Sequence, residues 1–242
     1  MNNLKTGARR LSVVKILLLI VVVAVSIWGL SEWAYRSSKL PPMGPQGLIG
    51  QRCQVEKVVL DSDQDGDGIY DLDDIVQGAR KDLEARPLYK DAYYAGGYPP
   101  ENEGVCTDVI WRALQNAGYD LKGMMDRDIQ EHTEDYPRVA GAPEPNIDFR
   151  RVANQESFFK KYAAQLTTEI IPWDPENLKQ WQGGDIVVFG PPYEHVGVVS
   201  DRRRPDGVPL LIHNAGPYTR EDSGLLNWPS PLTYHFRFPK AG

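Results

Sequence analysis

The stretch GDIVVFGPPYEHVGVVS, residues 184–200, decides how the second half of the chain folds. It holds two valine-rich apolar runs, residues 185–189 and 195–200, with a Gly-Pro-Pro turn between them. Short apolar runs bounded by Gly and Pro predict strands. Two more strands are predicted over residues 208–213 and 232–238, so we expect a sheet in the C-terminal part of the chain.

Helical patterns come before these strands. Apolar residues at three- and four-residue steps predict helices over residues 75–83, 106–117 and 155–166. Helices first and strands last indicate an α+β fold, in which N-terminal helices pack on a mostly antiparallel sheet. In the last strand Leu232, Tyr234, Phe236 and Phe238 alternate on one face, so we expect His235 to face solvent.

A cysteine stands at the start of one predicted helix. The Gly- and Pro-rich loop YYAGGYPPENEG, residues 93–104, leads to Cys106, where an amphipathic pattern begins, and Gly118 ends that pattern. Backbone N–H groups and the macrodipole favour negative charge at a helix start, which is where a thiol most easily becomes a thiolate. Cys106 is therefore a candidate nucleophile, with His195 and His213 at the ends of strand-like runs as candidate partners.

The charge is unevenly distributed. The chain has 242 residues and a net charge of −6, and residues 61–74 hold seven of its 33 acidic side chains against 27 basic ones. The remainder is close to neutral, so nothing indicates a nucleic-acid-binding protein.

The N-terminus predicts a membrane anchor. Basic residues precede an uncharged run over residues 16–30, and counted from Leu11 the span has 20 residues, enough to cross a bilayer. The basic flank is expected to stay cytoplasmic. Residues 1–30 are then a flank and anchor, and residues 31–60 an extracytoplasmic stalk with a strand-like patch over 55–60. We expect a single-pass protein of the cell membrane with its C-terminal domain outside; a cleaved signal peptide is the alternative.

Export leaves a second interpretation of the cysteines open. In an oxidising compartment Cys53 and Cys106 could form a disulfide, although the neighbours of Cys53 are polar.

The acidic segment, residues 61–74, has the spacing of a calcium loop. With Asp63 at position 1, carboxylates fall at positions 1, 3, 5, 9 and 12 and Gly68 at position 6, which is the pattern of an EF-hand-type loop. The candidate metal ligands are Asp63, Asp65, Asp67, Asp71 and Asp74. Position 12 is Asp instead of the usual Glu, and a solvated acidic linker is the alternative. We expect a structural Ca²⁺ and no cofactor for catalysis.

Several motifs in order carry a family resemblance. The loop before Cys106, the run from Gly184 to Phe189, and Glu194-His195-Val196-Gly197 resemble bacterial cell-wall cysteine peptidases of the NlpC type, which are papain-like. Gly104-Val105-Cys106-Thr107-Asp108-Val109, the Asn146–Val152 segment and His213-Asn214 resemble an exported family known as domain of unknown function 1287.

The resemblance implies roles for individual residues. Cys106 would be the nucleophile, His195 the general base and His213 the group that orients it, while Tyr93, or else Tyr94, would help to hold the oxyanion. The candidate substrate-binding residues are Asp108, Asp148, Arg150 and Asn214. Asp108 could instead only stabilise its helix, Arg150 or Arg151 could form a surface salt bridge, and Asn214 could replace His213. A zinc site of Cys106, His195 and His213 has suitable ligand types but no supporting spacing.

The predicted function follows from the resemblance and the anchor. Residues 75–242 would form an NlpC-like catalytic domain that hydrolyses amide bonds in cell-wall peptides outside the membrane. Two alternatives use the same residues: a non-catalytic wall-binding module on the same fold, and a cysteine acyltransferase.

Overall fold

The computed structural model describes residues 52–139 and 141–240, and from Arg52 onward the chain forms one compact unit. In those residues no helix has both the length and the apolar character that a membrane span requires. The predicted anchor and most of the predicted stalk fall on residues 1–51 and lie outside the described residues.

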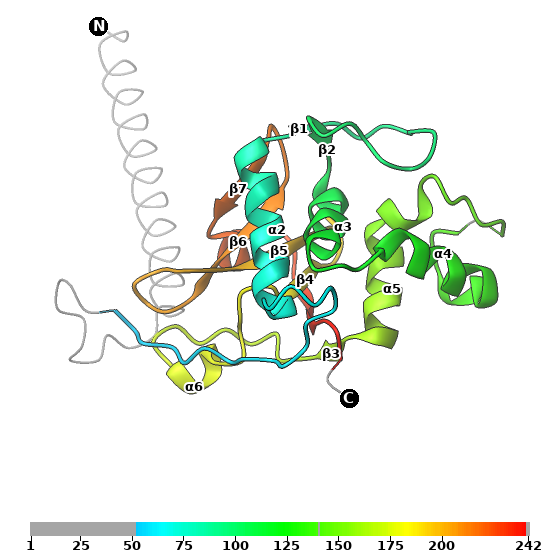
Figure 1. Ribbon diagram of the computed structural model, residues 1–242. Coiled ribbons are helices and arrows are strands. Elements are labelled where there is room, and N and C mark those ends of the chain that lie inside the picture. The colour runs from blue at the N-terminus through cyan, green and yellow to red at the C-terminus, as the bar shows by residue number, and fades with distance from the viewer. Residues whose placement is uncertain (1–51, 140, 241–242) are drawn as a thin grey trace, which may run out of the picture. The chain divides into compact units, whose positions relative to one another are not determined.

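The three predicted helices and four predicted strands occur in the predicted order, and further helices and strands lie between them (Figure 1). The helices are α2 (Asp71–Ala85), α3 (Cys106–Asn116), α4 (Leu121–Glu131), α5 (Val152–Tyr162), α6 (Pro175–Leu178) and α7 (Gly224–Asn227), with 3₁₀ turns η1 (Thr133–Asp135) and η2 (Asp148–Arg150). The strands are β1 (Leu88–Tyr89), β2 (Glu103–Gly104), β3 (Ala164–Gln165), β4 (Ile186–Phe189), β5 (His195–Arg203), β6 (Pro209–Asn214), β7 (Thr219–Asp222) and β8 (Leu232–Arg237).

The main sheet is antiparallel throughout and confirms the mixed α+β prediction. Its six strands lie in the order β3-β8-β4-β5-β6-β7, and the opening stretch of sequence forms the β4–β5 hairpin, in which Phe189 pairs with His195. A separate parallel pair, β1 and β2, comes just before α3. The sheet therefore presents the start of β5 beside the helix that begins with the cysteine.

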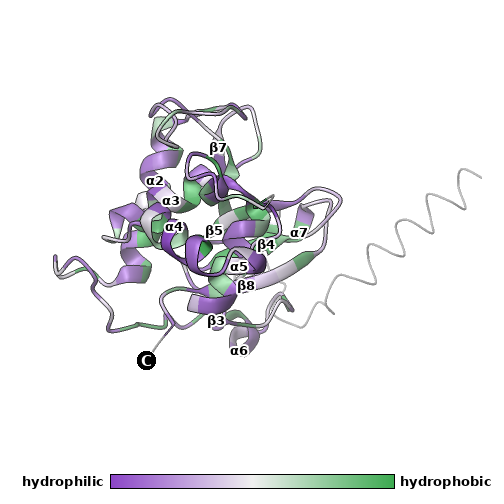
Figure 2. Cartoon of the chain, turned by 90° about the vertical axis from the view of Figure 1, so that its right-hand side faces the viewer, coloured by the Kyte–Doolittle hydropathy of each residue, from purple (hydrophilic) through white to green (hydrophobic). Residues whose placement is uncertain are grey.

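Both faces of the sheet are buried. On one face α2, α3, α4 and α5 cover Ile186, Val188 and Val198, and α2 packs beside α3. On the other face Val187, Phe189 and Val199 pack with Trp181 and Leu225. Figure 2 shows the hydrophobic colour gathered on the central strands β4 and β5. Burial on two faces explains why these strands are continuous apolar runs and do not alternate.

Several predicted element boundaries are wrong. The first helix begins at Asp71 instead of residue 75, because acidic side chains are favourable in a first helical turn. The helix predicted over 155–166 is α5, which ends at Tyr162 before the short strand β3. The strand-like patch at 55–60 forms no strand.

The prediction that His235 faces solvent is also wrong. Its side chain is buried, bonds Asp185 Oδ2 at 2.9 Å and stacks on Trp181 at a ring separation of 3.9 Å. Arg237 also bonds the carboxylate of Asp185. Simple alternation failed because the second face of the sheet has its own cover of apolar side chains.

The described end of the predicted stalk lies along the domain. Gln182 donates from Nε2 to the carbonyl of Glu56 at 3.1 Å and accepts the N–H of Val58 at 3.2 Å. The N–H of Cys53 donates to the carbonyl of Pro205 at 2.9 Å. We call residues 52–60 the N-terminal arm.

This position rules out the alternative of a disulfide between Cys53 and Cys106. Cys53 packs beside Gly207, past the end of β5, whereas Cys106 lies at the beginning of that strand, and both thiols are free. A strand of this length separates its two ends by roughly 25 Å. A disulfide needs Cα atoms within about 7 Å of one another.

Candidate active site

Cys106 is the first residue of α3, and a buried ion pair fixes the start of that helix. Asp108 accepts the N–H of Val105 at 2.8 Å, which caps the helix. Arg150 donates two hydrogen bonds to the same carboxylate, from Nε at 2.7 Å and from Nη2 at 2.8 Å. The indole N–H of Trp111 donates a further hydrogen bond to it. A buried carboxylate so fully bonded locks the turn that carries the cysteine.

The thiol of Cys106 is buried against the first residues of β5. The N–H groups of Val196, Thr107 and Cys106 itself point at the sulfur and act to lower its pKa. Burial acts more strongly and raises the pKa to about 11. The helix start therefore does not make a resting thiolate, contrary to the expectation from sequence, because desolvation of the charged form outweighs the N–H groups.

The two predicted histidines lie together, and a carboxylate extends the pair. His195 Nε2 lies 2.7 Å from His213 Nδ1, and His213 Nε2 lies 3.1 Å from Asp222 Oδ1. Burial lowers the pKa of His195 to about 2, with His213 and Arg220 acting in the same direction. Burial also lowers the pKa of His213, despite Asp222. Both rings are therefore neutral near pH 7.

The order of the bonds assigns the protons. An ionised carboxylate can only accept, so His213 must donate from Nε2 to Asp222. Its Nδ1 is then an acceptor, and His195 must donate to it from Nε2. The lone pair of His195 is left on Nδ1, free to take a proton. Although burial opposes it, the neighbouring His213 and Arg220 keep the pKa of Asp222 below its usual value, so the carboxylate stays ionised.

Trp228 covers this pair of histidines. Its ring stacks on His195 with a centroid separation of 4.0 Å and an interplanar angle of 16°, and its Nε1 donates to the carbonyl of Tyr193 at 2.9 Å. The stacked indole excludes water from the imidazole and holds its plane, because the ring is clamped between Trp228 and the strand.

A tyrosine that was not predicted from the sequence, Tyr89, lies in the neighbourhood of the cysteine and is 46% exposed. Tyr89 of β1 pairs with Gly104 of β2, two residues before Cys106. Burial first, and then the Cys106 thiol, raise the pKa of Tyr89, so its hydroxyl is within electrostatic range of the sulfur.

The two tyrosines predicted for this role have other partners. Tyr93 is exposed, and its hydroxyl lies 2.7 Å from Asn146 Nδ2 and 3.3 Å from Glu144 Oε1. Tyr94 donates to Glu103 at 2.7 Å.

The candidate substrate-binding residues are buried and engaged within the fold. Asp108 and Arg150 hold each other, with side chains 0% and 1% exposed. Asp148 accepts the N–H of Glu144 at 2.6 Å. Asn214 donates to the carbonyls of Pro87 and Gly104 and so ties the end of β6 to the β1–β2 pair. These side chains position the loop and helix of the cysteine instead of presenting free groups to a substrate.

The predicted metal ligands separate into two sets. Asp63, Asp65 and Asp67 place one oxygen each within 4.8 Å of the others. Among the described residues, these three carboxylates form the one cluster of His, Cys, Asp or Glu side chains close enough together to hold a metal ion. Asp71 and Asp74 lie in the first turn of α2 and are buried. The zinc alternative fails because His195 Nε2 and His213 Nδ1 face each other and leave no common point for a metal.

Comparison with known proteins identifies the family. Residues 76–238 match the family described as Domain of unknown function (DUF1287). The chain belongs to this family. The uncharacterized protein YijF of Escherichia coli (strain K12) is 36% identical to it over 172 residues, which cover 68% of this chain and 80% of YijF. No solved structure matches the chain.

The DUF1287 segment contains the whole cysteine centre, whereas the acidic loop precedes it. Sequence reasoning missed Asp222, Trp228 and Tyr89. Asp222 is reached through the β6–β7 hairpin, where Leu211 pairs with Asp222 and places it diagonally across from His213. Recognising a strand at residues 219–222 would have found it.

Proposed function

We propose that this DUF1287 protein is a cysteine hydrolase of amide bonds with an NlpC-type, papain-like catalytic domain. The observation that carries the proposal is the chain of bonds from His195 through His213 to Asp222, at the strand start against which the Cys106 thiol packs. A helix that begins at the cysteine and packs on a sheet whose strand begins at the histidine is the arrangement that the resemblance implies.

The chemistry starts from neutral groups. As the sulfur of Cys106 bonds to the substrate carbonyl carbon, its proton passes to Nδ1 of His195. The N–H groups directed at the sulfur, and the hydroxyl of Tyr89, would serve as donors to the developing oxyanion. The protonated imidazole then gives its proton to the leaving amine, and a thioester remains.

Water completes the cycle. His195 removes a proton from the water that attacks the thioester, then returns a proton to the departing sulfur, and the carboxylic acid product leaves. Throughout, His213 accepts the hydrogen bond from Nε2 of His195, and the negative carboxylate of Asp222 stabilises the positive charge on the imidazole pair. Trp228 keeps solvent from the imidazole while that charge is present.

The proposed substrate is a peptide of the bacterial cell wall, reached from outside the membrane. The apolar segment over residues 11–30 supports an anchor and an extracytoplasmic domain. A wall peptide is the amide substrate that a domain so tethered meets.

Purified full-length protein should release smaller products from peptidoglycan fragments, read by mass. Cys106→Ala should abolish the release, and Cys53→Ala, which changes the other thiol at the far end of β5, should leave it intact. Fragments that bind without change of mass favour the wall-binding module, and mass gain on an added amine favours the acyltransferase. Equal turnover by Cys106→Ala would refute the nucleophile.

A further inference from the structure

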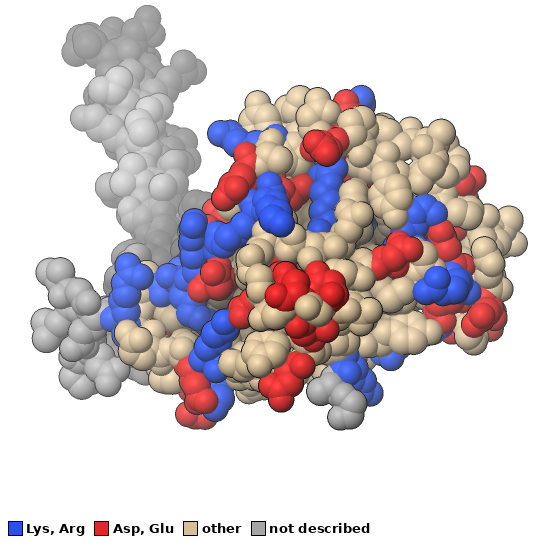
Figure 3. All heavy atoms as spheres, in the orientation of Figure 1, with Lys and Arg blue, Asp and Glu red and all other residues tan. Residues whose placement is uncertain are grey.

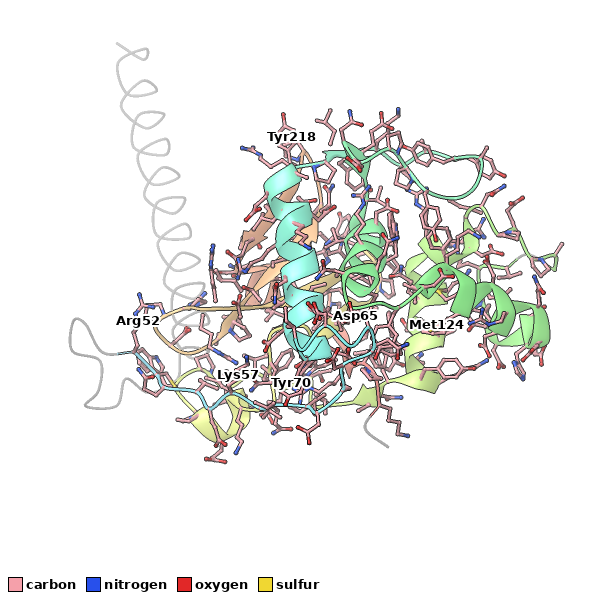
Figure 4. The ribbon with its side chains drawn as sticks, in the orientation of Figure 1. Arg52, Lys57, Asp65, Tyr70, Met124 and Tyr218 are labelled. Carbon is pink, nitrogen blue, oxygen red and sulfur yellow. The ribbon has the colours of Figure 1, made fainter. Side chains whose placement is uncertain are left out.

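The acidic segment before α2 folds into a tight loop around its own carboxylates. Asp63 accepts the N–H groups of Gly66 at 2.8 Å and Gly68 at 3.0 Å, and Asp67 accepts that of Ile69 at 2.8 Å. Gly66 and Gly68 have φ of 73° and 92°, which L side chains rarely adopt. Figure 3 shows acidic side chains gathered at this end of α2, and Figure 4 labels Asp65 there.

Three carboxylates lie at the separation that one calcium ion requires. Oxygens that share a Ca²⁺ at 2.3–2.6 Å can lie at most about 5 Å apart. One oxygen from each of Asp63, Asp65 and Asp67 lies within 4.8 Å of the other two.

The carboxylate oxygens of Asp71 accept hydrogen bonds within the fold, whereas one oxygen of Asp74 does not. Asp71 accepts the N–H of Gln64 at 2.8 Å and the hydroxyl of Tyr119 at 2.5 Å. Asp74 is 3% exposed, and its Oδ2 is buried without a hydrogen-bond partner. A buried carboxylate oxygen without a hydrogen-bond partner lowers the stability of the fold unless a ligand binds it.

Asp74 lies in the first turn of α2, which the loop enters directly. Its oxygens lie outside the group of three that come within 4.8 Å of one another, but the carboxylates of Asp67, Asp65 and Asp63 are within electrostatic range of it. Four carboxylates so arranged repel each other, and a bound dication offsets both the repulsion and the cost of the buried oxygen.

We propose that Asp63, Asp65 and Asp67 bind one Ca²⁺, that the unpartnered Oδ2 of Asp74 joins them as a ligand when the ion draws the loop toward α2, and that Asp71 shapes the loop from outside the ligand set. The backbone carbonyl of Ile69, at position 7 of the loop, is the expected fifth ligand. This proposal differs from the five-carboxylate set expected from sequence, because the oxygens of Asp71 accept hydrogen bonds from Gln64 and Tyr119.

The ion would join three parts of the domain. The loop continues the N-terminal arm, and the N–H of Asp71 donates to the carbonyl of Ser62 across it at 2.8 Å. The C-terminal end of the acidic loop leads directly into α2. Asp65 lies against Gly118, directly after α3, so closely that a Cβ at Gly118 would lie 2.8 Å from the Asp65 Cβ. Bound Ca²⁺ should therefore stabilise the packing of the arm, α2 and the end of the cysteine-bearing helix.

The test is a thermal melt of the full-length protein, purified in detergent and freed of metal with a chelator. Single loops in extracellular modules bind Ca²⁺ with a Kd of about 10⁻⁴–10⁻³ M. Ca²⁺ at about ten times the Kd should raise the melting midpoint by about 3–6 °C, and Mg²⁺ at the same concentration should not. No shift, or an equal shift with Mg²⁺, would overturn the proposal.

Matched variants distinguish the ligand set. Asp74→Asn should lose most of the Ca²⁺ shift without lowering the midpoint of the metal-free protein, because it also removes repulsion. Asp65→Asn, on an exposed side chain, should raise the Kd in a calorimetric titration at least tenfold. Asp73→Asn is the control: this neighbour bonds Lys57 at 2.7 Å, and its loss should leave the shift unchanged. A full shift in Asp74→Asn would refute its role as a ligand.

Discussion

Replacing Asp222 tests the proposed proton relay directly. In Asp222→Ala the Nε2–H of His213 loses its acceptor, and the imidazolium formed during catalysis loses its negative neighbour. A hydrogen bond between charged groups contributes about 1.5–3 kcal/mol. The Asp222 side chain is 39% exposed, so solvent screening reduces this to about 1–2 kcal/mol. We expect kcat to fall about 5–30-fold, at 1.36 kcal/mol per factor of ten, with little change in KM.

The assay is mass-resolved release from wall peptides at saturating and limiting substrate, and melting midpoints confirm that each variant is folded. Asp222→Asn keeps an oxygen that can accept from His213 and should lose less activity than Asp222→Ala. Arg220→Gln removes the ion pair on the other carboxylate oxygen, at 2.7 Å, but leaves the bond to His213, so its kcat should stay within about twofold. A folded Asp222→Ala protein with the wild-type kcat would show that His213 orients itself without the carboxylate.

Three further predictions follow from the same geometry. Tyr89→Phe should lower kcat/KM about tenfold while Tyr93→Phe leaves it within about twofold, because the Tyr89 hydroxyl is within electrostatic range of the thiol whereas that of Tyr93 bonds Asn146; equal losses would contradict the assignment. Arg150→Met should lower the free energy of unfolding in urea by about 3–5 kcal/mol, since it leaves Asp108 charged and buried, and adding Asp108→Asn should recover part of the loss. His195 has a folded pKa of about 2 against 6.5 in the unfolded chain, so the unfolded state binds more protons between these values. Stability should therefore fall as the pH drops from 6.5, and His195→Gln should flatten that slope by up to about 1.4 kcal/mol per pH unit; identical slopes would contradict a buried neutral imidazole.

The elements that the sequence predicted well are those with a local signal. Cys106 after a Gly-rich loop, and the valine-rich runs ending and beginning at Phe189 and His195, follow from periodicity and turn residues, and the structure has each of them. The pairing of His195 with His213 came from a family resemblance, and strand register now explains it, because Val198 pairs with Ile212.

The failures concern properties that depend on packing over long sequence distances. The role of Tyr93, which matches the motif, stays a prediction, whereas the β1–β2 pairing brings Tyr89 within electrostatic range of the cysteine, and β1 has no periodic signal in two residues. Arg150 was predicted as a substrate-binding residue, with a surface salt bridge as the alternative, whereas η2 turns it toward the buried Asp108. The thiol pKa was expected to fall because the helix start is visible in sequence, while the burial that outweighs it is not.

The burial of the Cys106 thiol also affects how readily its sulfur is oxidised. Oxidation to sulfenic acid proceeds through the thiolate, and a group whose pKa is raised to about 11 carries almost none at neutral pH. The sequence has one other cysteine, Cys53, which packs past the far end of β5, so no second thiol lies near enough to resolve a sulfenic acid at Cys106. Desolvation thus keeps the sulfur in the thiol form, which resists oxidation, and in the proposed mechanism the thiol loses its proton to His195 only when substrate is bound.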